Sequence, residues 1–104
     1  MNIKKTLVVA SSVLFFTGAN AEFIAGTNIT AAGCDAANTC FIQVDTPLTS
    51  CVNSAQINWD GNTPNGRSWY ASALTALAAG SEVNLGTTDV CVGNFDTLNF
   101  LTVR

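Results

Sequence analysis

The chain contains four cysteines, and their number and spacing limit its fold more than any other feature. They are Cys34, Cys40, Cys51 and Cys91. No two of them are spaced as C-x-x-C and the chain has no histidine, so the usual ligand sets of structural zinc are missing. In a small chain that leaves the reducing cytoplasm, an even number of cysteines indicates a disulfide framework. We therefore expect two disulfides and no metal or cofactor.

The N-terminal segment indicates that the chain is exported. Two lysines precede an apolar stretch of about ten residues, 7–16, and Ala19-Asn20-Ala21 follows. Positive, apolar and small-x-small segments in this order form a secretory signal peptide. The apolar stretch is shorter than the roughly 20 residues of a membrane-spanning helix. We expect residues 1–21 to be a signal peptide and residues 22–104 to be one domain in the periplasm or the medium, without stable membrane insertion.

Four cysteines allow three pairings, and all three are open at this point. We favour Cys34–Cys40 as a local link and Cys51–Cys91 as a long-range one. On the chain-entropy model the short loop stabilises the fold by roughly 2 kcal/mol and the long loop by roughly 4 kcal/mol. These links matter because a domain of about 83 residues buries only a small core.

The charge of the expected domain excludes one class of partner. Both lysines belong to the signal peptide, so residues 22–104 keep two arginines against seven acidic side chains, a net charge of −5. A surface of this sign does not attract a phosphate backbone or an anionic membrane. We expect no binding of nucleic acid.

The hydrophobic pattern predicts mostly strands. Residues 23–30 form a first strand with Gly26 as a bulge or bend, and residues 31–39 a loop of small residues. Alternation of apolar and polar residues predicts strands at 40–44 and, less clearly, 52–59. Further strands are expected around Val83 and Leu85, before a turn at 86–89, and at 95–103.

One helix is expected, over 67–79, after a cluster of turn-forming residues at 60–66. Asn65 or Ser68 would cap its start, and Gly80 would end it in a left-handed conformation. Its apolar stripe has the i, i+3, i+4, i+7 spacing and comprises Tyr70, Ala73, Leu74 and Leu77. The order strand, strand, strand, helix, strand, strand is that of the OB-fold. We therefore expect an α+β, mostly β fold, a small five-stranded OB-like barrel with one helix.

Several short motifs resemble those of known exported proteins. They are Ser50-Cys51, Trp59, the helical stretch 70–76, Gly80, the strand 83–85, Cys91 and Leu98-Asn99-Phe100. Over residues 40–103 the chain resembles a group of small exported bacterial proteins without an established activity. That resemblance implies a fold and a compartment, but no mechanism.

A more distant similarity is to the B subunits of the subtilase cytotoxin and related toxins, with their Cys-Ile strand, Trp, Tyr/Ala/Leu helix and Val strand. Those subunits are OB-folds that form pentamers and bind glycans, so the resemblance implies a glycan ligand and a homo-oligomer. The chain is shorter and lacks their extra C-terminal cysteine pair, and none of their sugar-contacting residues is transferred to it.

The residues suited to catalysis are few. Residues 22–104 contain no histidine and no lysine, and oxidised cysteines provide no thiolate. Two aspartate pairs remain, Asp45 with Asp60 and Asp89 with Asp96, but all four lie beside turn-forming residues, where aspartates commonly bond to their own backbone. A calcium loop around Asp60 lacks the spacing and the terminal glutamate of an EF-hand. We expect a protein that is not an enzyme, with an Asp-dependent hydrolase as the weaker alternative.

A binding site is predicted where aromatic, amide and charged side chains gather. The candidate residues are Trp59, Asp60, Asn62, Arg67 and Trp69. Apolar rings beside groups that orient hydroxyls are typical of a sugar site. The alternative is that Trp59 and Tyr70 belong to the core, and Trp69 is equally compatible with either role. The sequence therefore predicts a module that binds a glycan or a protein, or else a structural or assembly subunit of a secreted complex.

Overall fold

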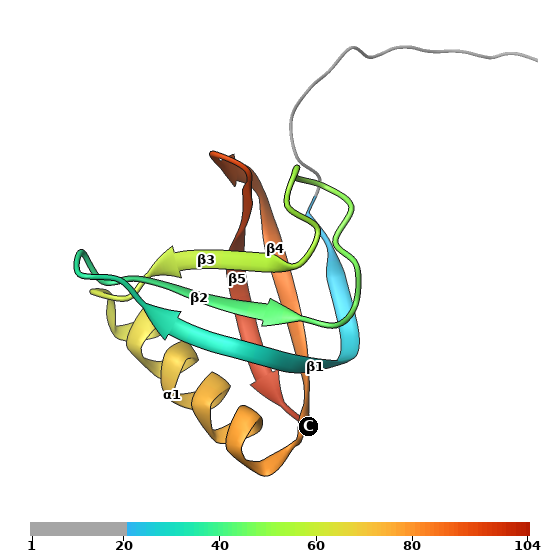
Figure 1. Ribbon diagram of the computed structural model, residues 1–104, viewed down its shortest axis with the longest axis vertical. Helices are drawn as coiled ribbons and strands as arrows, with labels where there is room; N and C mark the ends of the chain where they lie inside the picture. Colours follow the sequence, from blue (N-terminus) through green and yellow to red (C-terminus); the bar gives the residue numbers. More distant parts are fainter. Residues whose placement is uncertain (1–20) are drawn as a thin grey trace, which may run out of the picture.

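The computed structural model describes residues 21–104, which form five strands and one helix (Figure 1). The predicted signal peptide, apart from Ala21, lies outside the described residues. The elements are β1 (Phe23–Cys34), β2 (Thr39–Val44), β3 (Gln56–Asp60), α1 (Pro64–Ala79), β4 (Glu82–Val92) and β5 (Phe95–Val103).

The five strands close into a barrel in the order β1-β2-β3-β5-β4. All neighbours are antiparallel except β3 and β5, which run parallel over two residue pairs. Strand β1 closes the barrel by pairing with both β2 and β4. Figure 1 shows β4 and β5 crossing the direction of β1, β2 and β3, with α1 along one side of the barrel. The predicted OB-like barrel, with its helix between the third and fourth strands, is confirmed.

The core lies inside the barrel and beneath α1. Ile42, Ile57, Val83 and Leu85 have no exposed surface, and each is preceded in its strand by a residue that is at least partly exposed. This alternation is the period of a sheet with one buried face. The inward orientation predicted for Val83 and Leu85 is confirmed.

Strand β1 is bent but longer than predicted. Gly26 has φ +75°, and the pairing of β1 with β4 shifts between Ala25 and Thr27, so the bulge predicted at this glycine is confirmed. The loop predicted at 31–39 is wrong for its first half, because β1 runs on to Cys34. The small residues there leave room for the side chains of the neighbouring strand β2. Cys34 lies directly opposite Cys40 of β2.

The turn predicted at 86–89 is also wrong. Strand β4 continues through these residues to Val92, and its register against β5 shifts on both sides of Thr87. The Phe100 ring packs closely against the backbone of Gly86, since a Cβ built on this glycine would lie 2.3 Å from the ring. Turn-forming residues here produce irregular pairing within a long strand.

The helix begins three residues earlier than predicted and is capped by Thr63, not by Asn65 or Ser68. Thr63 Oγ1 accepts a hydrogen bond from the Gly66 N–H (2.9 Å), and Pro64 follows it, where a missing N–H costs nothing. Gly80 ends the helix with φ +68°, as predicted.

The predicted apolar stripe of α1 is only partly correct. Its fully buried positions are Gly66, Ala73 and Ala76, whereas Leu74 and Leu77 are 41% and 37% exposed. The helix packs against β1, β5 and β2, with Ala73 and Ala76 in the core and Trp69 and Tyr70 partly buried against it. Because small side chains let the helix lie close to the barrel, the larger leucines beside them stay at the edge of the contact.

Both predicted disulfides are present, Cys34–Cys40 and Cys51–Cys91, and the described residues hold no free cysteine. The first joins β1 to β2, and the second joins the segment before β3 to the end of β4. Two disulfides indicate an oxidising environment. None of the helices in residues 21–104 has the length and apolarity needed to cross a membrane.

Candidate ligand-binding site

The segment that leads from β3 into α1 brings together three of the predicted site residues. Asp60 Oδ1 accepts a hydrogen bond from the Asn62 N–H (2.8 Å), and Arg67 Nη1 donates to the Asn62 carbonyl oxygen (2.8 Å). All three side chains are exposed. The capping bond of Thr63 fixes the same segment, so the Arg67 guanidinium is held on the first turn of the helix.

The two tryptophans of the predicted site contact each other but face the core. Trp59 is 4% exposed, and its Nε1 donates to the Gly66 carbonyl oxygen (2.9 Å). Trp69 is half-buried and meets Trp59 edge to face, with ring centroids 6.3 Å apart. This placement agrees with the core alternative for Trp59 and fixes the position of the helix on the barrel. A role of Trp69 in binding stays a prediction.

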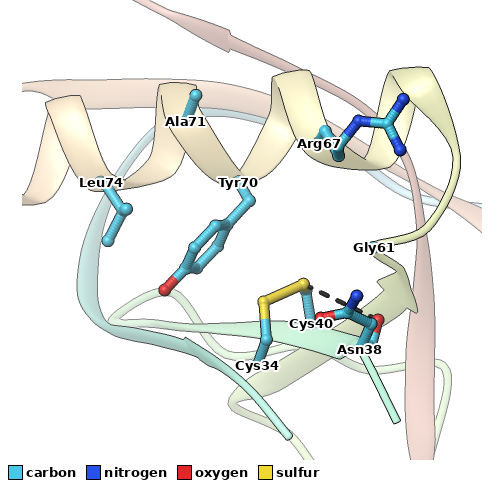
Figure 2. A pocket seen from close by; sticks show the side chains of 8 residues that line it. All are labelled: Cys34, Asn38, Cys40, Gly61, Arg67, Tyr70, Ala71 and Leu74. Carbon is cyan, nitrogen blue, oxygen red and sulfur yellow. Dashed lines mark hydrogen bonds between the residues drawn. A yellow bond between two sulfur atoms is a disulfide. The ribbon is translucent and has the colours of Figure 1, made fainter. Parts of the chain in front are cut away.

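A groove of about 450 Å³ lies between α1 and the facing ends of β1, β2 and β3 (Figure 2). It is lined by Cys34, Asn38, Cys40, Gly61, Arg67, Tyr70, Ala71 and Leu74. Figure 2 shows Tyr70 and Leu74 projecting from the helix toward the side on which the Cys34–Cys40 disulfide lies. Arg67 lies at the end of the groove that is nearest the start of α1. The disulfide therefore forms part of the wall of the groove as well as joining two strands.

Polar groups around this groove differ in how fully they are bonded. Asn38 has φ +63° in the turn between β1 and β2, and its Nδ2 donates to Asn62 Oδ1 (2.9 Å). This bond ties the β1–β2 turn to the β3–α1 segment. Within residues 21–104 the Tyr70 hydroxyl has no hydrogen-bond partner. The groove thus offers an aromatic ring, an unpaired hydroxyl and a guanidinium on a fixed frame.

Two groove residues, Tyr70 and Asn38, were not among the predicted site residues. Tyr70 follows Arg67 by three positions on the helix, and this spacing alone places the two side chains on one face. Asn38 reaches the groove only because β1 and β2 are paired, and no local pattern in the sequence predicts its position.

A second hollow of about 310 Å³ also adjoins the end of β3. Its lining is Thr39, Asn58, Trp59, Asp60, Val92 and Thr97. Trp59 and Asp60 thus line this hollow rather than the groove. Of the five predicted site residues, Arg67 therefore lines the groove, Trp59 and Asp60 line the second hollow, and Asn62 and Trp69 line neither.

The aspartates considered for catalysis have different surroundings. Asp45 accepts hydrogen bonds from Thr27 Oγ1, the Asn28 N–H and Asn28 Nδ2 (3.0–3.1 Å), and these bonds, the Asn28 backbone first, lower its pKa. Asp96, expected beside a turn, lies inside the barrel on β5. Among residues 21–104 no three His, Cys, Asp or Glu side chains are grouped so that they could hold a metal ion.

Neither a protein-family model nor a curated protein sequence matches this chain.

Proposed function

We propose that the protein is an exported binding module without enzymatic activity, and that it recognises a glycan in the groove between α1 and the β1–β2 turn. The observation that supports the proposal is that Tyr70 and Arg67, one turn apart on α1, both line the groove beside the Cys34–Cys40 disulfide. Carbohydrates present apolar ring faces and many hydroxyls, so their sites combine an aromatic side chain with a few fixed polar groups.

The frame of the groove favours recognition without large rearrangement. The Cys34–Cys40 disulfide, the Asn38–Asn62 bond and the Thr63 cap hold three separate segments in place. A ligand that enters a fixed site does not have to order loops, and this saves part of the entropy lost on binding. Asn62, bonded to both Asn38 and Arg67, joins two of the polar residues that line the groove.

Screening the disulfide-bonded protein against a glycan array tests this proposal, and titration calorimetry then measures the affinity of any ligand found. Arg67→Ala and Tyr70→Ala are expected to weaken binding about 10- to 100-fold, because each removes a contact worth roughly 1.5–3 kcal/mol. Tyr70→Phe keeps the ring and removes only the hydroxyl, so it separates stacking from hydrogen bonding.

Arg104→Ala is the matched control, since Arg104 is the other arginine and pairs with Glu82 (3.7 Å) on a different part of the surface. This variant should bind as the unaltered protein does. A protein that binds no glycan on the array, or that binds equally well after Arg67→Ala and Tyr70→Ala, contradicts the proposal.

A structural or assembly role is the second candidate, and one surface favours it. Three valines flank the Cys51–Cys91 disulfide in the sequence and are strongly exposed: Val52 (80%), Val90 (52%) and Val92 (61%). Exposed apolar side chains gathered around one fixed point are typical of a contact with another protein. In this case the partner is either a subunit of a secreted complex or a second copy of the chain.

Light scattering after size exclusion distinguishes a homo-oligomer from a monomer. If copies associate through these valines, Val52→Asp combined with Val92→Asp should yield a monomer with an unchanged circular dichroism spectrum. If the unaltered protein is monomeric, self-association through these valines is excluded, and the partner would have to be a different protein.

A further inference from the structure

The barrel encloses a carboxyl group whose partner is missing from the described residues. Asp96 lies on β5 between Ile57 of β3 and Cys91 of β4, and none of its surface is exposed. Neither of its two carboxyl oxygens has a hydrogen-bond partner within residues 21–104. An ionised carboxylate buried in this way is strongly unfavourable unless a cation or several donors face it.

The residue that follows the predicted cleavage site is fixed close to this carboxyl group. The Glu22 N–H donates to Thr87 Oγ1 (3.0 Å), and the Thr87 N–H donates to the Glu22 carbonyl oxygen (2.9 Å). Glu22 Oε2 accepts from the N–H of Thr49 (3.1 Å) and from its hydroxyl. Backbone and side chain of Glu22 are therefore both anchored, although it precedes the first strand.

The sheet register places Thr87, whose hydroxyl accepts the Glu22 N–H, on the same buried face as Asp96. Thr87 is buried, and its partner on β5 is Leu98, two residues beyond Asp96 and on the same face of the strand. In a regular pair such residues are diagonal neighbours on one face, and here β4 bulges between Thr87 and Cys91, which is the partner of Asp96. The Glu22 carboxylate is also close enough to add to the effect of burial in raising the pKa of Asp96.

We propose that the α-ammonium group of Glu22, created when the signal peptide is removed, is the counter-ion of Asp96. Hydrolysis of the Ala21–Glu22 peptide bond adds one water, leaves the carboxylate on Ala21 and the amine on Glu22, and the amine takes up a proton at neutral pH. The single N–H that now bonds to Thr87 becomes a cation with three donors. One N–H keeps its hydrogen bond to Thr87 Oγ1, and the other two point toward the carboxyl oxygens of Asp96.

This inference rests on the predicted cleavage after Ala21 and not on the proposed glycan site. It means that the folded domain distinguishes its processed from its unprocessed form. With the signal peptide attached, no hydrogen-bond donor within residues 21–104 faces the Asp96 carboxyl group, and the Glu22 carboxylate lies close to it. After its removal, one positive charge lies between Glu22 and Asp96, and the barrel gains an internal ion pair.

The experiment uses full-length chain exported and processed by a secreting host, with the N-terminus determined by intact mass. Residues 22–104 contain no lysine, so the α-amino group is the single primary amine and an N-hydroxysuccinimide ester of acetic acid acetylates it selectively. Urea midpoints are compared for the free and the acetylated protein, with Asp96 unaltered and in Asp96→Asn. Asp89→Asn, an exposed aspartate of β4, is the control.

Acetylation is expected to lower the urea midpoint of the unaltered protein and of Asp89→Asn, and to leave that of Asp96→Asn unchanged. Equal effects of acetylation in the presence and absence of Asp96, or a processed chain that does not begin at Glu22, overturn the proposal.

A second measurement needs no substitution. An ammonium paired with a buried carboxylate has a pKa above the ordinary range of an α-amino group, about 7.7–8.0, and so reacts slowly at neutral pH. We expect acetylation of the folded protein to be at least tenfold slower than that of the same protein in urea with its disulfides intact. Equal rates also overturn the proposal.

Discussion

At the scale of single residues, Asp45 and Asp96 show how the barrel treats the same side chain in opposite ways. Asp45 is exposed and accepts three hydrogen bonds from Thr27 and Asn28, which favour its charged form and lower its pKa. Asp96 is buried without donors from the described residues, and burial raises its pKa. The ionised form of Asp45 therefore stabilises the fold, whereas that of Asp96 needs a cation.

Asp45→Asn should alter the acid stability of the protein. Because the pKa of Asp45 is lower in the fold than the ordinary 3.8, its contribution is fully present above that pH and is lost as the pH falls through the lowered value. The variant should be less stable at neutral pH and should lose less stability on acidification. Urea unfolding between about pH 2 and pH 7 measures both effects. An acid dependence identical to that of the unaltered protein contradicts this assignment.

At the scale of elements, the contact between α1 and β3 depends on the absence of a side chain at Gly66. A Cβ there would lie 2.0 Å from the Asp60 carbonyl oxygen, and the Gly66 carbonyl oxygen accepts the indole bond of Trp59. The start of the helix, the end of β3 and a core tryptophan are therefore positioned together. The same segment carries Arg67, so the geometry of the groove depends on this contact.

Gly66→Ala should destabilise the protein by more than Gly80→Ala. The first introduces a clash with backbone, for which overpacking gives about 1–3 kcal/mol, with a further loss if the Trp59 bond breaks. The second meets open space and only restricts a left-handed residue, at about 1 kcal/mol. Urea unfolding measures the free energy of unfolding of both variants. Equal losses would show that the helix moves aside to relieve the clash at position 66 without loss of stability.

The sequence predicts elements best where one local rule decides. Gly80 ends the helix and Ile42 and Val44 point inward, because a left-handed cap and an alternating strand each require only neighbouring residues. The buried face of α1 is predicted correctly at Ala73 but not elsewhere, because hydrophobicity favours Leu74 and Leu77, whereas the close helix contact buries Ala76. Gly86 resembles a turn residue in the sequence, and only the ring of Phe100 on the next strand explains it.

The site follows the same division. Asp60, Asn62 and Arg67 lie within eight residues, and their gathering was predictable from the turn that joins β3 to α1. Asn38 enters the groove from a turn more than twenty residues away, and the burial of Trp59 depends on closure of the barrel. Both require the tertiary structure, as does the isolation of Asp96.

At the scale of the whole molecule, two disulfides of very different reach support one small core. Cys34–Cys40 joins residues six positions apart, and Cys51–Cys91 joins residues 40 apart. The short link secures a hairpin that the β1–β2 pairing already forms. The long link connects the segment before β3 with the far end of β4, which otherwise extends past the barrel.

Removing the long link should therefore destabilise the protein more. The chain-entropy model gives about 4 kcal/mol for Cys51→Ala with Cys91→Ala, and about 2 kcal/mol for Cys34→Ala with Cys40→Ala. Urea unfolding of the two double variants measures the difference. A larger loss from the short link would mean that its place in the groove wall matters more than its loop length.

The strand order also determines when each cysteine finds its partner. If the chain emerges from a secretion pore with its N-terminus first, Cys51 appears long before Cys91, while Cys34 and Cys40 are already outside. Because the last two lie opposite each other at the end of a hairpin, they can oxidise early and so cease to compete for Cys51. The barrel closes only when β4 arrives to flank β1, and Cys91 arrives with it. On that route the hairpin disulfide would act as a safeguard against mispairing, a role separate from the stability it gives the finished fold.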